Sequence, residues 1–176
     1  NPANTTVNYG STAYPLVAHS ICVSVAGGSA SAVAQAIWNK KPPGCNYNGN
    51  TSATVYDTNY PVPQPSYTVT WLTPTSTPVY FKIQIQNNPL LPSNIVQLVQ
   101  NAVIESFTGQ DGGSAVGIAS TSYSGRYYAN INAVSPYVNV IEVYLGLSAS
   151  PSTLSIAMGI DQLPTISASN IAVNLV

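Results

Sequence analysis

Few residues in this chain of 176 have side chains that could catalyse a reaction. It contains one histidine, His19, and five carboxylates that are scattered along the sequence: Asp57, Glu105, Asp111, Glu142 and Asp161. A histidine acting as a general base needs a nucleophile and an orienting carboxylate nearby. Ser20 is adjacent to His19, but neighbouring residues of a strand point to opposite faces. We therefore expect His19 to be structural, expect no glycosidase-like carboxylate pair, and assign no catalytic residue.

The two cysteines, Cys22 and Cys45, leave two alternatives open. A strand, a helix and a turn between them could bring them close enough for one disulfide. The favoured interpretation is two unpaired thiols, one of them largely buried, because cysteine is commonly a buried residue. Two cysteines and one histidine do not complete the usual four-ligand zinc site. The sequence therefore predicts no metal and no cofactor.

Three motifs resemble functional signals only weakly. The glycine-rich segment Gly109–Gly117 lacks the lysine and the spacing of a phosphate-binding loop, and it follows a predicted helix instead of preceding one. We expect it to be a flexible connection. Glycosylation sequons begin at Asn4 and Asn50. Such matches arise by chance in a chain so rich in Asn, Ser and Thr, and we interpret them in that way.

Two other pairs of residues have structural interpretations. We expect Trp38 and Trp71 to anchor a hydrophobic core instead of forming a platform for a ligand. Arg126 and Glu142 are a candidate buried or interfacial ion pair.

Charge is unusually sparse. Only 5% of the residues are Asp, Glu, Lys or Arg, against about 25% in ordinary domains. Asn, Ser, Thr, Gln and Tyr must therefore cover the surface, which is typical of secreted proteins, fibres and virion parts and suits wide, hydrogen-bonded subunit contacts. Four cations cannot form the basic stripe of a nucleic-acid binder, and no apolar run approaches the length of a membrane span. The Asn1-Pro2 start leads us to expect a fragment or a processed product.

Hydrophobic periodicity predicts the elements of the first part of the chain. A strand is expected at Val17–Val25, and Gly27-Gly28 ends it. The spacing of Ala30, Val33, Ala34, Ile37 and Trp38 predicts a helix over Ser29–Lys41, capped by Ser29 or Ser31 and stopped by Pro42-Pro43-Gly44. Alternation predicts further strands at Ser52–Thr58 and Tyr67–Leu72, with a short extended segment at Thr5–Tyr9.

The second part begins with a strand at Val79–Gln86. A helix follows over Ser93–Phe107, capped by Ser93, with an apolar stripe of Ile95, Leu98, Val99, Ala102, Val103 and Phe107. A third helix is expected over Ser124–Val134, with Ser124 as its cap and Tyr127, Tyr128, Ile131 and Val134 facing inward. The remaining predicted strands are a short extended piece near Val116–Ser120, then Val138–Leu147, Leu154–Ile160 and Ile171–Val176, with Gln162-Leu163-Pro164 as a link.

These elements predict an α+β protein of two small two-layer sandwiches, each a mostly antiparallel sheet covered by helices. The first domain spans residues 1–78 in the order β-α-β-β. The second spans residues 79–176 in the order β-α-α-β-β-β. The segment Thr73–Pro78 is the expected boundary, because its prolines disfavour both helix and central strand.

In this order, the motifs resemble the C-terminal part of the baseplate J-like family of contractile-tailed bacteriophages. A strand (HSICVSV) runs through Gly-Gly into a helix that ends in KKPPG, and a loop with Asn-Gly follows. An aromatic hairpin comes next (YTVTWLTPTSTPVYFKI). A late helix precedes two final strands around a Leu-Pro turn (GIDQLPTISASNIAVNLV). The resemblance covers about residues 14–176.

The resemblance implies a wedge component of the tail baseplate, a structural virion protein that is assembled in the host cytoplasm. Its partners would be other baseplate or tail proteins, and it would help couple host attachment to sheath contraction. The family brings no catalytic residue to this chain. We expect the isolated chain to be a monomer or a weak oligomer.

Two other classes stay open. The uncharged surface and the sequons would also suit an extracellular adhesin. Exposed tyrosines such as Tyr47, Tyr56 or Tyr60 would suit a carbohydrate-binding module.

Overall fold

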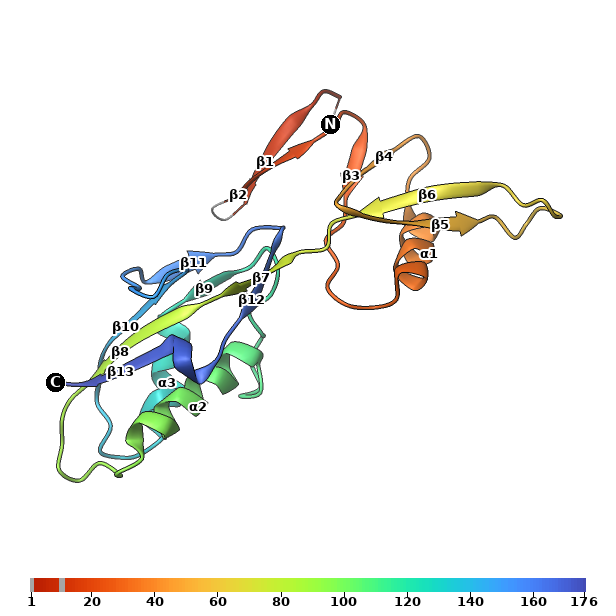
Figure 1. Ribbon diagram of the computed structural model, residues 1–176. Helices are drawn as coiled ribbons and strands as arrows, with labels where there is room; N and C mark the ends of the chain where they lie inside the picture. The colour runs from red at the N-terminus through yellow and green to blue at the C-terminus, as the bar shows by residue number, and fades with distance from the viewer. Residues whose placement is uncertain (1, 10–11) are drawn as a thin grey trace. The chain divides into compact units, whose positions relative to one another are not determined.

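The computed structural model describes residues 2–9 and 12–176 and shows an α+β protein (Figure 1). It has three helices and many small, mostly antiparallel sheets, which confirms the predicted fold class. The chain divides into two compact units. Unit 1 comprises the described residues up to Thr75 together with Gly159–Asp161, and unit 2 comprises Ser76–Met158 and Gln162–Val176. The division into domains 1–78 and 79–176 stays a prediction, because compact contacts do not show that each part folds alone.

Unit 1 consists of short strands around one helix. The strands are arranged as an antiparallel hairpin of β1 with β2, a parallel pair of β3 with β4, and an antiparallel hairpin of β5 with β6. In chain order the elements are β1 (Thr5–Tyr9), β2 (Thr12–Leu16), β3 (Ser20–Cys22), α1 (Ala30–Lys40), β4 (Asn46–Asn48), β5 (Thr51–Tyr56) and β6 (Ser66–Trp71).

Helix α1 begins and ends close to its predicted bounds. The Ser29 side chain accepts a hydrogen bond from the Ala32 backbone N–H at 3.3 Å, so Ser29 is the cap. Before it, Gly27 and Gly28 both have positive φ, a conformation that glycine adopts without steric cost. The buried face of the helix packs on the β5–β6 hairpin, forming a small core of Ala34, Ile37, Val55, Val69 and Trp71. Trp71 is a core residue, as predicted.

The predicted strand Val17–Val25 is broken in the structure. Only Ser20–Cys22 forms a regular strand, and Ser24 makes an isolated parallel bridge with Leu72. His19 lies in a turn before β3 with φ at 51°, and its carbonyl accepts a hydrogen bond from the Asn46 N–H. The irregular backbone arises because the segment switches partners, from β4 to the end of β6.

Unit 2 is organised around a three-stranded sheet in the order β10-β8-β13. The central strand β8 pairs antiparallel with β10 and parallel with β13, and the helices α2 and α3 pack against the sheet (Figure 1). In chain order the elements are β7 (Thr75–Pro78, which starts in unit 1), β8 (Tyr80–Ile85), α2 (Ile95–Thr108), β9 (Thr121–Tyr123), α3 (Gly125–Ala133), β10 (Val140–Gly146), β11 (Ser155–Ala157), β12 (Gln162–Thr165), a 3-10 turn (Ala168–Asn170) and β13 (Ile171–Leu175).

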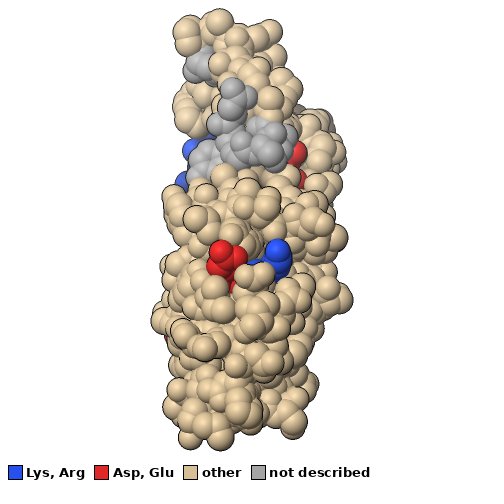
Figure 2. Space-filling view, turned by 90° about the vertical axis from the view of Figure 1, so that its left-hand side faces the viewer, with Lys and Arg blue, Asp and Glu red and all other residues tan. Residues whose placement is uncertain are grey.

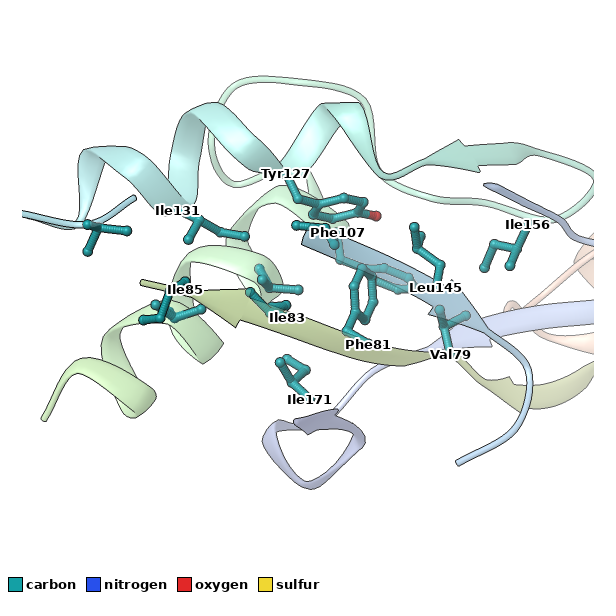
Figure 3. Packing of buried hydrophobic residues seen from close by; sticks show 14 of the residues in the cluster. Val79, Phe81, Ile83, Ile85, Phe107, Tyr127, Ile131, Leu145, Ile156 and Ile171 are labelled. Atoms are coloured by element: carbon teal, nitrogen blue, oxygen red, sulfur yellow. The ribbon is translucent and has the colours of Figure 1, made fainter. Parts of the chain in front are cut away.

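Phe81 of β8 lies in the middle of the core of unit 2 (Figure 3). Its ring meets Phe107 edge-on at 6.3 Å between centroids and Tyr127 at 4.8 Å, arrangements that aromatic quadrupoles favour. The Tyr127 hydroxyl is satisfied inside the core by Ser122 Oγ at 2.8 Å. Around them lie the alternate residues of the sheet, including Ile83, Ile85, Val143 and Leu145, all fully buried.

The helices of unit 2 correct two details of the prediction. Leu98 is only half-buried, whereas the rest of the predicted α2 stripe is buried. The cap of α2 is Asn94, not Ser93, and its side chain makes no capping hydrogen bond. Ser124 is the N-cap of α3, as predicted, although its side chain makes no capping hydrogen bond. In α3, Tyr127 and Ile131 are buried, and Tyr128 and Val134 are half-buried.

Proline-containing segments form strands that the sequence did not predict. The expected boundary Thr73–Pro78 contains β7, and the expected link at Gln162-Leu163-Pro164 is β12; the two pair with each other. In the same way β2, which contains Pro15, pairs with β1. Each of these is a two-stranded sheet, where proline can occupy an edge. The extended piece expected near Val116–Ser120 is displaced to β9.

Candidate functional site

Among residues 2–9 and 12–176, no three His, Cys, Asp or Glu side chains gather where they could hold a metal ion. Cys22 and Cys45 are both free thiols and half-buried. Burial raises the pKa of the Cys22 thiol above its usual value, which reduces its fraction of reactive thiolate near neutral pH. The buried Asp57 carboxylate accepts hydrogen bonds from the backbone N–H and the amide of Asn59. The Asp57 carboxylate thus has structural partners, and among the described residues these groups do not converge on one point.

The predicted pairing of Arg126 with Glu142 is wrong. Arg126 forms its ion pair with Asp111 at 3.0 Å, and its guanidinium also donates to the Ser106 carbonyl through Nε at 3.1 Å and an Nη at 2.7 Å. Asp111 in turn accepts from the Gly113 N–H at 3.0 Å. This backbone hydrogen bond is the largest cause that lowers the pKa of Asp111, with Ser106 and Arg126 lowering it further.

The result is a glycine loop that is tied to the end of α2. A side chain at Gly113 would meet the Arg126 guanidinium, which would have to move away from its present position. We expected Gly109–Gly117 to be a flexible connection, and the structure instead shows it anchored at Asp111 and Gly113. The Arg126 guanidinium and the Asp111 carboxylate both hold the loop in place, so this ion pair has a structural role.

Neither sequon presents a simple modification site. The Asn50 amide is bonded to one backbone position on both sides: its Oδ1 accepts from the Thr73 N–H at 2.7 Å and its Nδ2 donates to the Thr73 carbonyl at 3.0 Å. The Asn4 Oδ1 accepts from the Ala18 N–H at 2.8 Å. In both sequons the asparagine side chain joins two separate segments of unit 1.

The tyrosines proposed as ligand platforms differ in exposure. Tyr47 is half-buried, and the Lys41 Nζ lies 4.7 Å from the centroid of its ring. Tyr56 and Tyr60 are both more than half exposed, at the end of the β5–β6 hairpin. Tyr67, on β6, is 44% exposed and stacks on Trp38 with the ring centroids 5.7 Å apart. Trp38 is half-buried and packs against the core of unit 1, as expected of a core residue, but it lies at the margin of that core, in contact with the exposed Tyr67 ring.

One face of the unit 2 sheet carries charge. Ladder partners share a face, so Lys82 lies beside Tyr144, and its Nζ is 5.9 Å from the Tyr144 ring centroid. A hydrogen bond to the Glu142 carboxylate is the first cause of a raised pKa at Tyr144. Charge is sparse on the face that Figure 2 shows, where acidic and basic atoms form only small spots in an otherwise uncharged surface.

Five exposed apolar side chains belong to segments that meet at one end of the unit 2 sheet. The backbone of Val176 bonds to Ile85 and Asn87, and Gln86 bonds to Asn139, so the chain end and the 135–139 loop flank the end of β8 (Figure 1). The exposed apolar residues there are Leu90, Tyr137, Ile141, Leu175 and Val176. Ile141 is the extra residue of a β-bulge in β10, and bulges re-aim a side chain away from the ladder. We call these five residues the apolar end.

A hollow of about 440 Å³ in unit 1 lies against the β1–β2 hairpin. Its lining combines apolar residues such as Leu16 and Val17 with the amides Asn4 and Asn48 and contains no His, Cys, Asp, Glu, Lys or Arg. It offers hydrogen bonds but no group that could transfer a proton near neutral pH.

Comparison with known proteins adds no relative: no family model matches the chain, and neither does any curated protein. Among the described residues, no helix has the length and apolar character needed to cross a membrane.

Sequence reasoning missed the apolar end and the exposed Tyr67. The signal for Ile141 was present, because the run VNVIEVYLGL contains two adjacent apolar residues, Val140 and Ile141, which strict alternation cannot both bury. For Leu175, Val176 and Leu90 no local signal exists, since their proximity depends on the parallel pairing of β13 with β8.

Proposed function

We propose that this chain is a structural component of a contractile phage tail baseplate, a wedge protein that acts through protein–protein assembly and catalyses no reaction. The observation that carries the proposal is the apolar end. Exposed large apolar groups that gather on a protein mark contact sites. Leu90, the most exposed of the five, has 60% of its surface exposed, and Ile141 has 47%.

The sparse charge supports the same role. Interfaces between subunits are depleted of charge at their centres and enriched in tyrosine. A chain with nine charged residues and twelve tyrosines has that composition over much of its surface. The ordered series of structural motifs that resembles the baseplate J-like family supports the tail as the location, with other baseplate or tail proteins as partners.

A reconstruction of tail particles that contain this protein tests the proposal. We expect the apolar end to be covered by a neighbouring subunit, and both units to lie within the baseplate. Density that shows both units fully exposed, without a neighbour at the apolar end, would refute the assembly role.

A carbohydrate-binding module is the second candidate, and one observation favours it. Tyr56 and Tyr60 are exposed together at the end of the β5–β6 hairpin, and aromatic rings in such positions can stack on sugars. A glycan array probed with the native chain and with Tyr56→Ala and Tyr60→Ala decides between the two. Binding that both substitutions abolish would support the module, and no binding to any glycan would leave assembly as the better proposal.

A further inference from the structure

Strand β6 has an unpaired edge. In the β5–β6 ladder the Asp57 N–H donates to the Pro65 carbonyl at 2.9 Å. Hydrogen-bonded pairs alternate along an antiparallel ladder, so the backbone N–H and C=O groups of Tyr67 and Val69 point toward β5. The N–H and C=O groups of Ser66, Thr68 and Thr70 then point away from β5.

Leu72 confirms this direction. It is the next residue in the same series, and on that edge its N–H donates to Val23 and its carbonyl accepts from Val25, each at 2.9 Å. The chain itself therefore occupies the edge at Leu72. No described residue pairs with the edge along Ser66–Thr70.

Nothing in the strand protects this edge. Natural proteins blunt free edges with charges, prolines, bulges or very short strands. Other strands of this chain show these devices: β10 has Glu142 and a bulge, and β7 and β12 contain Pro78 and Pro164. Strand β6 (Ser66–Trp71), like β5 and β13, contains no charged residue and no proline, and its register with β5 is unbroken.

We infer that the free edge of β6 pairs with β6 of a second copy of this chain, antiparallel about a two-fold axis at Thr68. The alternation of the ladder permits this register, in which Thr68 faces its own counterpart and Ser66 faces Thr70 of the other copy. Opposed threonines and a Ser–Thr pair stabilise strand pairing, and no like charges are opposed. The same surface serves both copies, as a two-fold interface requires.

The exposed ring of Tyr67 gains a neighbour in this arrangement. It falls opposite Val69 of the second copy, on the face where it stacks on Trp38. The ring is 44% exposed in the single chain, and the backbone of the second copy's strand would cover part of it. A platform of two hairpins thus extends the α1-covered sheet across both copies.

The pairing is short, because the Ser24–Leu72 bridge limits it to Ser66–Thr70. It covers less than the roughly 1,600 Å² of a standard stable interface, so the dimer is weak in isolation. This inference deepens the proposed assembly function, and its biological role rests on that function. The pairing itself is measurable on the isolated chain, so its failure would leave the particle reconstruction as an independent test of the baseplate role.

Sedimentation equilibrium of the whole chain, from micromolar to millimolar concentration, tests the inference. We expect the native chain to dimerise weakly. Thr68→Lys and Thr68→Glu each place like charges opposite each other and should weaken self-association at least about tenfold. An equimolar mixture of the two variants opposes unlike charges and should restore the dimer.

Thr54→Lys is the matched control, because Thr54 is the exposed ladder partner of Thr68 in the same hairpin but belongs to β5. It should dimerise like the native chain, and circular dichroism should show all three variants folded. A native chain that stays monomeric at every concentration would overturn the inference. So would a mixture that fails to restore association, or a Thr54→Lys variant that loses it as Thr68→Lys does.

Discussion

The Asn50 side chain holds the backbone of Thr73 from both sides, accepting from its N–H at 2.7 Å and donating to its carbonyl at 3.0 Å. Asn50 precedes β5 and Thr73 follows β6, so both residues lie at the open end of the β5–β6 hairpin. Beside them, Gly49 passes so close to the Trp71 carbonyl that a side chain at Gly49 would collide with it. Asn50 thus closes the open end of the hairpin that carries Tyr56, Tyr60 and Tyr67.

We predict that Asn50→Ala lowers the free energy of unfolding by about 1–2 kcal/mol, because both hydrogen bonds to the Thr73 backbone are lost and the Thr73 groups depend on water instead. Urea unfolding followed by tryptophan fluorescence measures the change, since Trp71 is adjacent. Asn94→Ala is the control: Asn94 is also exposed, and its side chain makes no capping bond. Equal effects of the two substitutions would contradict the role given to Asn50.

The α2 stripe leads to a second prediction, with two valines of one helix as a matched pair. Val99 is fully buried and Val96 is exposed. Val99→Ala should lower the free energy of unfolding by about 1–3 kcal/mol, from lost burial and a residual cavity. Val96→Ala should change it by no more than about 0.5 kcal/mol. Leu98→Ala should fall between them, because Leu98 is half-buried.

Chemical denaturation of the three variants measures the order of these effects. A larger loss for Val96→Ala than for Val99→Ala would mean that the helix is rotated about its axis relative to the sheet.

Asp111 gives a pH-dependent prediction. Its pKa in the folded chain lies below the ordinary value of 3.8, first because of the Gly113 N–H and then through Ser106 and Arg126. A lowered pKa means that the ionised form stabilises the fold above the unfolded value, and that this contribution is lost as pH falls through the folded value. The native chain should therefore lose stability below about pH 4.

Asp111→Asn should lack this part of the pH dependence. We expect the native chain to be more stable than Asp111→Asn near pH 7, with a difference that shrinks as the pH falls. Thermal unfolding of both proteins across this pH range measures it. A difference that stays constant down to the lowest pH at which both fold would show that the carboxylate charge contributes nothing.

Local patterns predicted the elements that depend on neighbouring residues. Helix α1 follows from apolar spacing with Ser29 as its cap, and β8 follows from alternation. Local patterns could not predict the strand order of the unit 2 sheet, because β13 pairs with β8 through Ile171 and Phe81, which are distant in the sequence. No local signal specifies such a register, and prolines hid β2, β7 and β12.

The same limit applies to the candidate sites. Arg126 pairs with Asp111 because the turn after α2 returns the loop to the start of α3, and sequence reasoning chose Glu142 without that geometry. The exposed tyrosines Tyr56 and Tyr60 were proposed correctly as surface residues, since a proline-rich connector follows them. The free edge of β6 could not be predicted, because it depends on which strand stays unpaired.

The last prediction concerns the apolar end. If it is the contact surface of an assembled baseplate, a charge there should block assembly without unfolding the chain, because burying an unpaired charge at an interface is costly. Ile141→Glu is the sharpest change, since the bulge holds this side chain outside the ladder and 47% exposed. Ser52→Glu, on the exposed face of β5, introduces the same charge in unit 1.

Both variants should unfold at nearly the native temperature, because both positions are exposed. In particles assembled with each variant, we expect Ile141→Glu to be incorporated at less than about a tenth of the native level, which corresponds to 1.4 kcal/mol or more of lost association energy. Quantitative mass spectrometry of purified particles measures incorporation. Native incorporation of Ile141→Glu together with loss of Ser52→Glu would move the contact surface from the apolar end of unit 2 to the β5–β6 hairpin of unit 1.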